Sequence, residues 1–222
     1  MKKTIITLLC LLIFTGSKAQ IEKGSIALGL NAGLGFTYDS DKYQSNNSFR
    51  ISAQPVFEYF IANNLSLGAA VNSSFQFSNS EYTEYTLIPY SYKSDNYRQT
   101  YSLNILLKKY WFASPQIGFT VSPQLASTYA EENASNTNDN RTTTYNTNYW
   151  YSSAMLNVGA VYFVRPNLAI EAQTNFINYS NYPGSPSSNN NERHSFSVLA
   201  FQSSLTLGIK YVFGKKKDSL TP

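Results

Sequence analysis

The sequence is poor in the residues that metal sites and thiol chemistry need. Its 222 residues contain one cysteine, Cys10, and one histidine, His194. Because zinc centres are built mostly from several Cys and His ligands, this composition excludes such a centre. A lone cysteine also has no partner for a disulfide within the chain. We therefore expect no metal and no other cofactor.

Charge is scarce as well. Charged residues make up 14% of the chain, whereas about 25% is typical of soluble domains. Aromatic residues reach 15%, with 18 Tyr. The formal net charge is +4, but Lys2, Lys3 and Lys18 all lie in the first 19 residues, and the remainder carries only +1. The basic balance therefore gives no argument for a nucleic-acid partner.

The first residues have the pattern of an export signal. Lys2 and Lys3 precede an apolar run over 4–14, and small residues surround Lys18 at Ser17 and Ala19. This order of basic, apolar and small residues predicts a signal peptide over 1–19, cleaved before Gln20. The run is well short of the ~20 residues of a membrane-spanning helix, so we expect an exported chain and not an anchored one.

Residues beyond the signal alternate between apolar and polar. Over 26–38 the even positions are Ile, Leu, Leu, Ala, Leu, Phe and Tyr, while the odd ones are mostly Gly, Ala and Asn. Period-two alternation indicates β-strands. The same pattern predicts seven more strands, near 48–60, 65–79, 97–110, 117–129, 150–163, 168–179 and 196–213. Each exceeds the ~9–11 residues that a tilted transmembrane strand requires.

The connections between these strands alternate in length. Segments 61–64, 113–116 and 164–167 are short, whereas 39–47, 80–96, 130–149 and 180–195 are long and polar. Short periplasmic turns and long outer loops are typical of outer-membrane barrels. The sequence therefore predicts an all-β fold, an eight-stranded antiparallel up-and-down transmembrane β-barrel over 20–214. Both termini lie in the periplasm, and 215–222 forms a short periplasmic tail.

Alternation alone does not say which set of side chains faces outward, since a soluble lipocalin-like barrel alternates equally well. The non-apolar set is mostly small, and the strands carry very few charges. A narrow lumen needs small side chains, and a wall facing water would carry more charge. We therefore expect the apolar set to face lipid.

Aromatic residues recur before each short turn. Because their rings favour the membrane–water interface, we expect interface positions for Tyr59, Tyr110, Trp111 and Tyr162 at the inner side. A second belt at the outer side is expected from Trp150, together with Tyr38, Tyr97, Tyr129, Tyr149 and Tyr179.

The few strand charges fall on the polar phase. Glu58, Lys108, Glu171 and Lys210 lie near the periplasmic strand ends. Since unpaired buried charge is costly, we predict that these four cluster and close the lower lumen, either as a neutral packing device or as a gate. Arg50 and Arg98 share the polar phase and are grouped with these lumen charges. Bulges are expected at Pro55 and Pro123, where a ladder donor is missing, and at a slip of the alternation near Ala200 and Phe201.

The last strand reads Thr206-Leu-Gly-Ile-Lys-Tyr-Val-Phe213. With Gly208, Tyr211 and Phe213 in their places, it resembles the insertion signal of outer-membrane barrels, although Gly214–Pro222 follow the final aromatic residue. The whole plan is similar to OmpA/OmpX-type small barrels and to the outer-membrane β-barrel domain families. The resemblance implies a bacterial outer-membrane location, surrounding lipid and lipopolysaccharide, and recognition by the barrel-assembly machinery. It implies no catalytic residue, and we expect a monomer.

One enzymatic hypothesis concerns His194, because some eight-stranded barrels modify lipid A with a His and a Ser at the outer mouth. Here Ser195 and Ser197 point to the opposite face from His194, so a base within reach of a nucleophile is missing. We expect no enzyme. Two function classes stay open: a structural or surface-interaction barrel with a mostly packed lumen, and a narrow pore for ions or small solutes. The narrowness of eight strands favours the first.

Overall fold

The computed structural model describes residues 21–40, 44–84, 90–138, 141–182, 193–198 and 205–214. They form nine antiparallel strands: β1 (Ile26–Ser40), β2 (Gln44–Ala62), β3 (Leu65–Glu84), β4 (Tyr90–Phe112), β5 (Ile117–Asn138), β6 (Arg141–Arg165), β7 (Leu168–Tyr182), β8 (Arg193–Val198) and β9 (Leu205–Phe213). The predicted signal peptide, the tail over 215–222 and the slip near Ala200 lie outside these residues. Among the residues described, no helix is long and apolar enough to cross a membrane.

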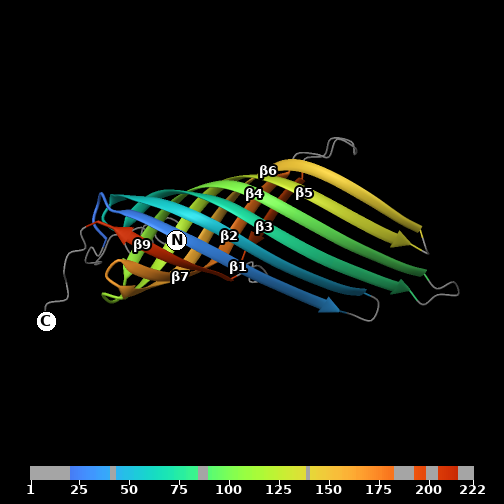
Figure 1. Ribbon diagram of the computed structural model, residues 1–222, viewed down its shortest axis with the longest axis horizontal. Helices are drawn as coiled ribbons and strands as arrows, with labels where there is room; N and C mark the ends of the chain where they lie inside the picture. Colours follow the sequence, from blue (N-terminus) through green and yellow to red (C-terminus); the bar gives the residue numbers. More distant parts are fainter. Residues whose placement is uncertain are drawn as a thin grey trace, which may run out of the picture.

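The strands close into a ring. Strands β1 to β7 each pair with the next along the chain, and β9 closes the ring between β7 and β1. Strand β8 pairs with the outer part of β7. The predicted eighth strand over 196–213 thus corresponds to two described strands, β8 before residues 199–204 and β9 after them. The ring therefore has eight members, which confirms the predicted barrel (Figure 1).

The apolar set faces outward. In β1, Leu28 and Leu34 are 48% and 63% exposed, whereas Asn31 on the opposite phase is 4% exposed. Strand β9 repeats the pattern, because Leu207 and Ile209 lie outside while Lys210 is buried in the lumen. A soluble barrel would show the reverse. An apolar outer wall around a polar interior is the arrangement that lipid stabilises.

The strands are much longer on one side of the barrel than predicted. Strand β6 has 25 residues, which at ~3.4 Å per residue is far more than a ~30 Å hydrocarbon core needs. The ladders continue to Glu84–Tyr90 and Asn138–Arg141, so most of the long loops predicted at 80–96 and 130–149 are strand. The segments 39–47 and 180–195 are likewise shortened. Figure 1 shows β3 to β6 extending well beyond β7 and β9. The loop prediction was wrong because a strand in water keeps its backbone pairing without any apolar alternation.

The prolines do not produce the expected bulges. Between β2 and β3 the pairing passes from Ala53–Ser73 to Val56–Ala70, an equal step on both strands across Pro55. Between β4 and β5 it passes from Leu106–Gln124 to Lys109–Val121 across Pro123, again without a shift. Each proline therefore interrupts the ladder on one side only. The register shifts lie elsewhere. In β7, for example, Leu156 pairs with Ile177 and Asn157 with Asn175, so β7 has one extra residue at this point.

We predict that Gly159→Ala destabilises the barrel by about 1–3 kcal/mol, the usual cost of overpacking. A Cβ at this inward position would lie 2.5 Å from the backbone oxygen of Ala172, which cannot move without displacing β7. Urea unfolding in detergent micelles, followed by gel migration without boiling, measures this loss. Ala160→Val on the outer face is the control and should change stability by less than about 0.5 kcal/mol. Equal stability of both variants would contradict the packing argument.

Candidate functional site

Four charged side chains meet in the half of the lumen nearest Ile26 and Phe213. We call it the periplasmic half, and the other the extracellular half, after the orientation that the sequence predicts. Glu58 of β2, Lys108 of β4, Glu171 of β7 and Lys210 of β9 are each at most 3% exposed. Lys210 Nζ lies 2.6 Å from Glu58 Oε1 and 2.9 Å from Glu171 Oε2. Lys108 Nζ lies 2.8 Å from Glu171 Oε1 and 3.5 Å from Glu58 Oε1. The structure thus brings together the four residues that the sequence grouped, and we call them the ion quartet.

Neutral groups complete the quartet. The hydroxyls of Ser66 and Tyr110 each donate to Glu58 Oε2 at 2.7 Å, and Thr120 donates to Glu171 Oε1 at 3.3 Å. Lys210 also donates to the Tyr110 hydroxyl at 2.6 Å. Every carboxylate oxygen therefore has a partner, and two cations balance two anions. Pairing of this completeness is what buried charges require.

An aromatic layer, formed by Phe60, Tyr110, Phe112 and Phe163, lies next to the quartet. The rings of Phe60 and Tyr110 are 5.6 Å apart, those of Tyr110 and Phe112 6.3 Å, and those of Phe112 and Phe163 5.8 Å. Phe60 and Tyr110 are fully buried. Small aliphatic side chains fill the same cluster, including Val161 and Val212. The aromatic layer and the quartet together close the periplasmic end.

The segment before β1 completes this closure. Ile21 is 3% exposed and belongs to the same apolar cluster. Its backbone N–H donates to Asn64 Oδ1 at 3.0 Å, and its carbonyl accepts from the Asn64 N–H at 3.0 Å. Asn64 has a φ of 58°, a left-handed conformation that Asn tolerates better than most residues. The turn between β2 and β3 thus holds Ile21 against the end of the lumen.

Tyr110 corrects the interface prediction. It was expected at the membrane surface, but it is fully buried and bonded to the ion quartet. The reason is the period of two, because adjacent aromatic residues in a strand point to opposite faces. In each aromatic group the rings alternate between the two faces. Tyr59, Trp111 and Tyr162 lie outside, and their neighbours Phe60, Tyr110, Phe112 and Phe163 lie inside.

Four other predicted interface residues lie on the outer wall. Tyr59, Tyr162 and Trp150 are 44%, 45% and 60% exposed, and Trp111 is half-buried. In the closing strand, Tyr211 and Phe213 also face outward, whereas Gly208 faces the lumen beside Asn31. Their roles at the interface and in assembly stay predictions.

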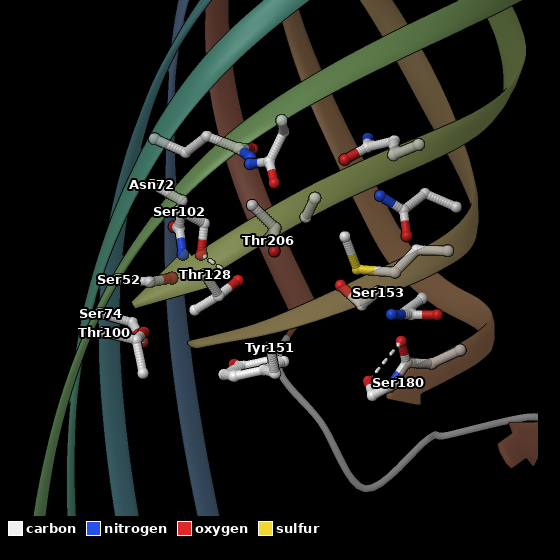
Figure 2. Close-up of a pocket in the computed structure, with 18 of the residues that line it drawn as sticks. Ser52, Asn72, Ser74, Thr100, Ser102, Thr128, Tyr151, Ser153, Ser180 and Thr206 are labelled. Atoms are coloured by element: carbon white, nitrogen blue, oxygen red, sulfur yellow. Dashed lines mark hydrogen bonds between the residues drawn. The ribbon is translucent and has the colours of Figure 1, made fainter. Parts of the chain in front are cut away.

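Arg50 and Arg98 do not join the quartet, which corrects their grouping with it. Both line a separate cavity of about 340 Å³ in the extracellular half of the lumen. The register explains the separation. Arg50 lies opposite Gln76, which lies opposite Arg98, far along these strands from the Glu58 level. Figure 2 shows hydroxyl and amide side chains from several strands pointing into this cavity.

Tyrosines surround Arg98. Its guanidinium carbon is 5.6 Å from the ring centres of both Tyr149 and Tyr151, and Tyr151 stacks on Tyr182 at 4.7 Å. Tyr149, expected in the outer belt, therefore faces inward. The sequence reasoning missed these rings as lumen residues. The phase of β6 could have identified them, because Tyr149 and Tyr151 share the odd positions of Ser153 and Asn157, which also line the cavity.

Among the described residues of the outer mouth, His194 lies on the opposite face of β8 from Ser195 and Ser197. Its ring stacks on Tyr179, with the Tyr179 hydroxyl 2.9 Å from Nδ1. Its neighbours on the same phase of β8, Phe196 and Val198, are exposed, so Ser195 and Ser197 point the other way. Within the described ranges, no group of three or more His, Cys, Asp or Glu residues could hold a metal ion.

A closed ring of eight antiparallel strands, with an apolar exterior and a polar lumen, defines a small transmembrane β-barrel of the bacterial outer membrane. Comparison with protein-family models and with curated proteins finds no match. Among solved structures, the chain is similar to the attachment invasion locus protein Ail of Yersinia pestis, at 14% identity over 86% of this chain and 99% of that one, with a TM-score of 0.38.

Two further solved structures show a similar identity, coverage and TM-score. A major outer membrane protein of Thermus thermophilus is 19% identical, covering 85% of this chain and 99% of that chain with a TM-score of 0.45. OprG of Pseudomonas aeruginosa is 11% identical, covering 89% and 99% with a TM-score of 0.42.

We predict that Glu171→Gln lowers the free energy of unfolding by about 3–5 kcal/mol, because it leaves a buried lysine without its counter-charge. The double change Lys108→Gln with Glu171→Gln keeps the lumen neutral and should cost clearly less than Glu171→Gln alone. Urea unfolding in micelles measures both.

Lys93→Gln is the control for charge removal. Lys93 lies 3.6 Å from Glu81 with both side chains about half exposed, and exposed pairs contribute less than about 1 kcal/mol. If Glu171→Gln were as mild as Lys93→Gln, the quartet would not be a structural requirement.

Proposed function

We propose that this protein is a non-conducting outer-membrane barrel with a structural or surface-interaction role. The closed periplasmic end is the observation that carries this proposal. The ion quartet and the aromatic layer occupy successive levels of the lumen, and their largest side chains are fully buried. An eight-stranded interior is just wide enough for side chains to fill or for one small ligand to occupy.

The physical cost of opening supports this proposal over the narrow pore. A passing ion would have to separate Lys210 from both Glu58 and Glu171, since Lys210 bonds to both. Breaking a buried pair costs about 3–5 kcal/mol. The ion would also have to displace Phe60 and Tyr110, neither of which has any water-exposed surface.

The extracellular side supports the surface role. Strands β4, β5 and β6 carry 23, 22 and 25 residues, so a paired sheet extends past the membrane. Exposed rings such as Tyr145 lie on this extension. A preformed sheet offers a contact surface with less ordering cost than a flexible loop. The outward position of His194, with the nearby serines on the opposite face, favours this role over lipid-A chemistry.

The surroundings of the barrel follow from the same proposal. The outer wall would contact outer-membrane lipid and lipopolysaccharide. The closing strand β9, with Gly208, Tyr211 and Phe213, would be recognised by the barrel-assembly machinery. Strand β9 covers the edge of β1 over Ile26–Leu34, which is compatible with a monomer.

We predict that the purified barrel shows no stepwise conductance in planar bilayers, because the quartet and the aromatic layer close its base. Phe60→Ala combined with Phe163→Ala should leave this unchanged, since the quartet still blocks the lumen. Lys210→Glu replaces a neutral cluster by one with excess negative charge, and we expect transient cation-selective openings from this variant.

Stepwise conductance by the unaltered protein, with a selectivity that Lys210→Glu reverses, would instead establish the narrow pore. Folding of each variant is checked by the migration shift of boiled against unboiled samples.

A further inference from the structure

We propose that the extracellular half of the lumen is a binding site for a small polyhydroxylated anion, such as a sugar acid, held by Arg50 and Arg98. The inference rests on the proposed function in one respect: a lumen closed below is a pocket and not a passage. The chemistry of the site comes from the residues of the cavity itself.

The first observation is charge. Among the residues that the structure describes, the cavity of about 340 Å³ is lined by two arginines and by no carboxylate. The nearest acid opposite Arg98 in the register is Glu132, and its carboxylate accepts hydrogen bonds from Asn96 and from the Tyr149 hydroxyl. Even counting Glu132, one positive charge is in excess. The lower lumen, in contrast, is neutral, so the excess is a local property of this cavity.

The second observation is a set of buried polar atoms without a protein partner. Arg50 Nε, Arg98 Nε and Arg98 Nη2 are buried donors of this kind. Guanidinium groups bind carboxylates and phosphates through pairs of such N–H groups. Because no protein group occupies these donors, the two guanidinium groups would turn them toward an anion in the cavity without breaking a protein hydrogen bond.

The same cavity holds unpartnered acceptors. Asn104 Oδ1, Gln173 Oε1 and Asn175 Oδ1 are buried, line the cavity and have no protein donor. A bare inorganic anion offers nothing to these oxygens, whereas hydroxyl groups donate to them. The hydroxyls of Ser74 and Thr100, 2.6 Å apart, and of Ser102 and Thr128, 2.8 Å apart, add groups that both donate and accept. The ligand that matches donors and acceptors together carries one anionic group and several hydroxyls.

The third observation is the aromatic wall. Tyr151 and Tyr182 both line the cavity and stack on each other at 4.7 Å (Figure 2 labels Tyr151 at its edge). Apolar ring faces beside convergent polar groups are typical of small-molecule sites. The cavity volume lies near the lower end of the ~300–1,000 Å³ of such sites, which fits a monosaccharide-sized ligand. Ordered water could satisfy the amide oxygens, but water does not neutralise the arginines.

Calorimetric titration of the folded, signal-free protein in detergent micelles at low salt tests the proposal, with glucuronate, glucose and inorganic phosphate as probes. We expect saturable binding of one glucuronate per barrel. Glucose and phosphate should each bind at least about tenfold more weakly, because each satisfies only part of the site. Arg50→Gln and Arg98→Gln should each weaken glucuronate binding by about tenfold or more.

Lys93→Gln, which removes an exposed cation from the same extracellular sheet, is the matched control and should leave binding unchanged. Arg98→Lys is the second variant, for use if Arg98→Gln fails to fold. It keeps the charge, so it should preserve the fold, but it loses the planar guanidinium and should weaken glucuronate binding. The migration shift on boiling verifies folding of each variant.

The proposal would be overturned if glucuronate did not bind, or if phosphate bound as tightly as glucuronate. It would also be overturned if neither arginine substitution weakened glucuronate binding. The conductance measurement separates the two proposals. Glucuronate binding to a conducting barrel would refute only the closed base, whereas a non-conducting barrel without glucuronate binding would refute only the site.

Discussion

The structure depends on one constraint: in lipid, every backbone N–H and C=O group needs a partner within the protein. The β1–β9 and β7–β9 ladders satisfy it by closing the sheet. Closure at eight strands makes the lumen narrow, and a charge buried in a narrow lumen is costly unless it is paired. The ion quartet and the inward glycines are consequences of this closure. Gly159, for instance, leaves no room for a Cβ beside Ala172.

The same closure divides the lumen into two chemically distinct halves. In the periplasmic half, two lysines and two glutamates balance one another in charge, and the hydroxyls of Ser66, Tyr110 and Thr120 complete their hydrogen bonds. Aromatic rings pack beside them. In the extracellular half, Arg50 and Arg98 are not balanced in this way, and several amide oxygens have no protein partner. Buried polar groups are fully partnered in the periplasmic half and only partly partnered in the extracellular half. This difference distinguishes a structural closure from a candidate binding site, although both are built from the same alternating strand pattern.

Much of the fold could be predicted from the sequence, because the apolar outer face must follow the pleat of each strand. The positions of β1, β7 and the inner ends of the remaining strands followed from this alternation. The outer parts of β4, β5 and β6 could not be predicted, since strands in water need backbone pairing but no apolar face. Pro55 and Pro123 misled for a related reason. Each lacks a donor toward one neighbour only, so the ladder loses a bond without gaining a residue.

For the candidate site, the sequence by itself determined which residues point inward, and hence that Glu58, Lys108, Glu171 and Lys210 share one interior. Strand phase is a local property, so it is written in the sequence. Only the tertiary structure decided which inward residues meet. The register around the ring sets the height of each side chain, and it brought Tyr110 to the quartet while placing Arg50 and Arg98 in another cavity. That register depends on all the strand pairings at once, which no single strand contains.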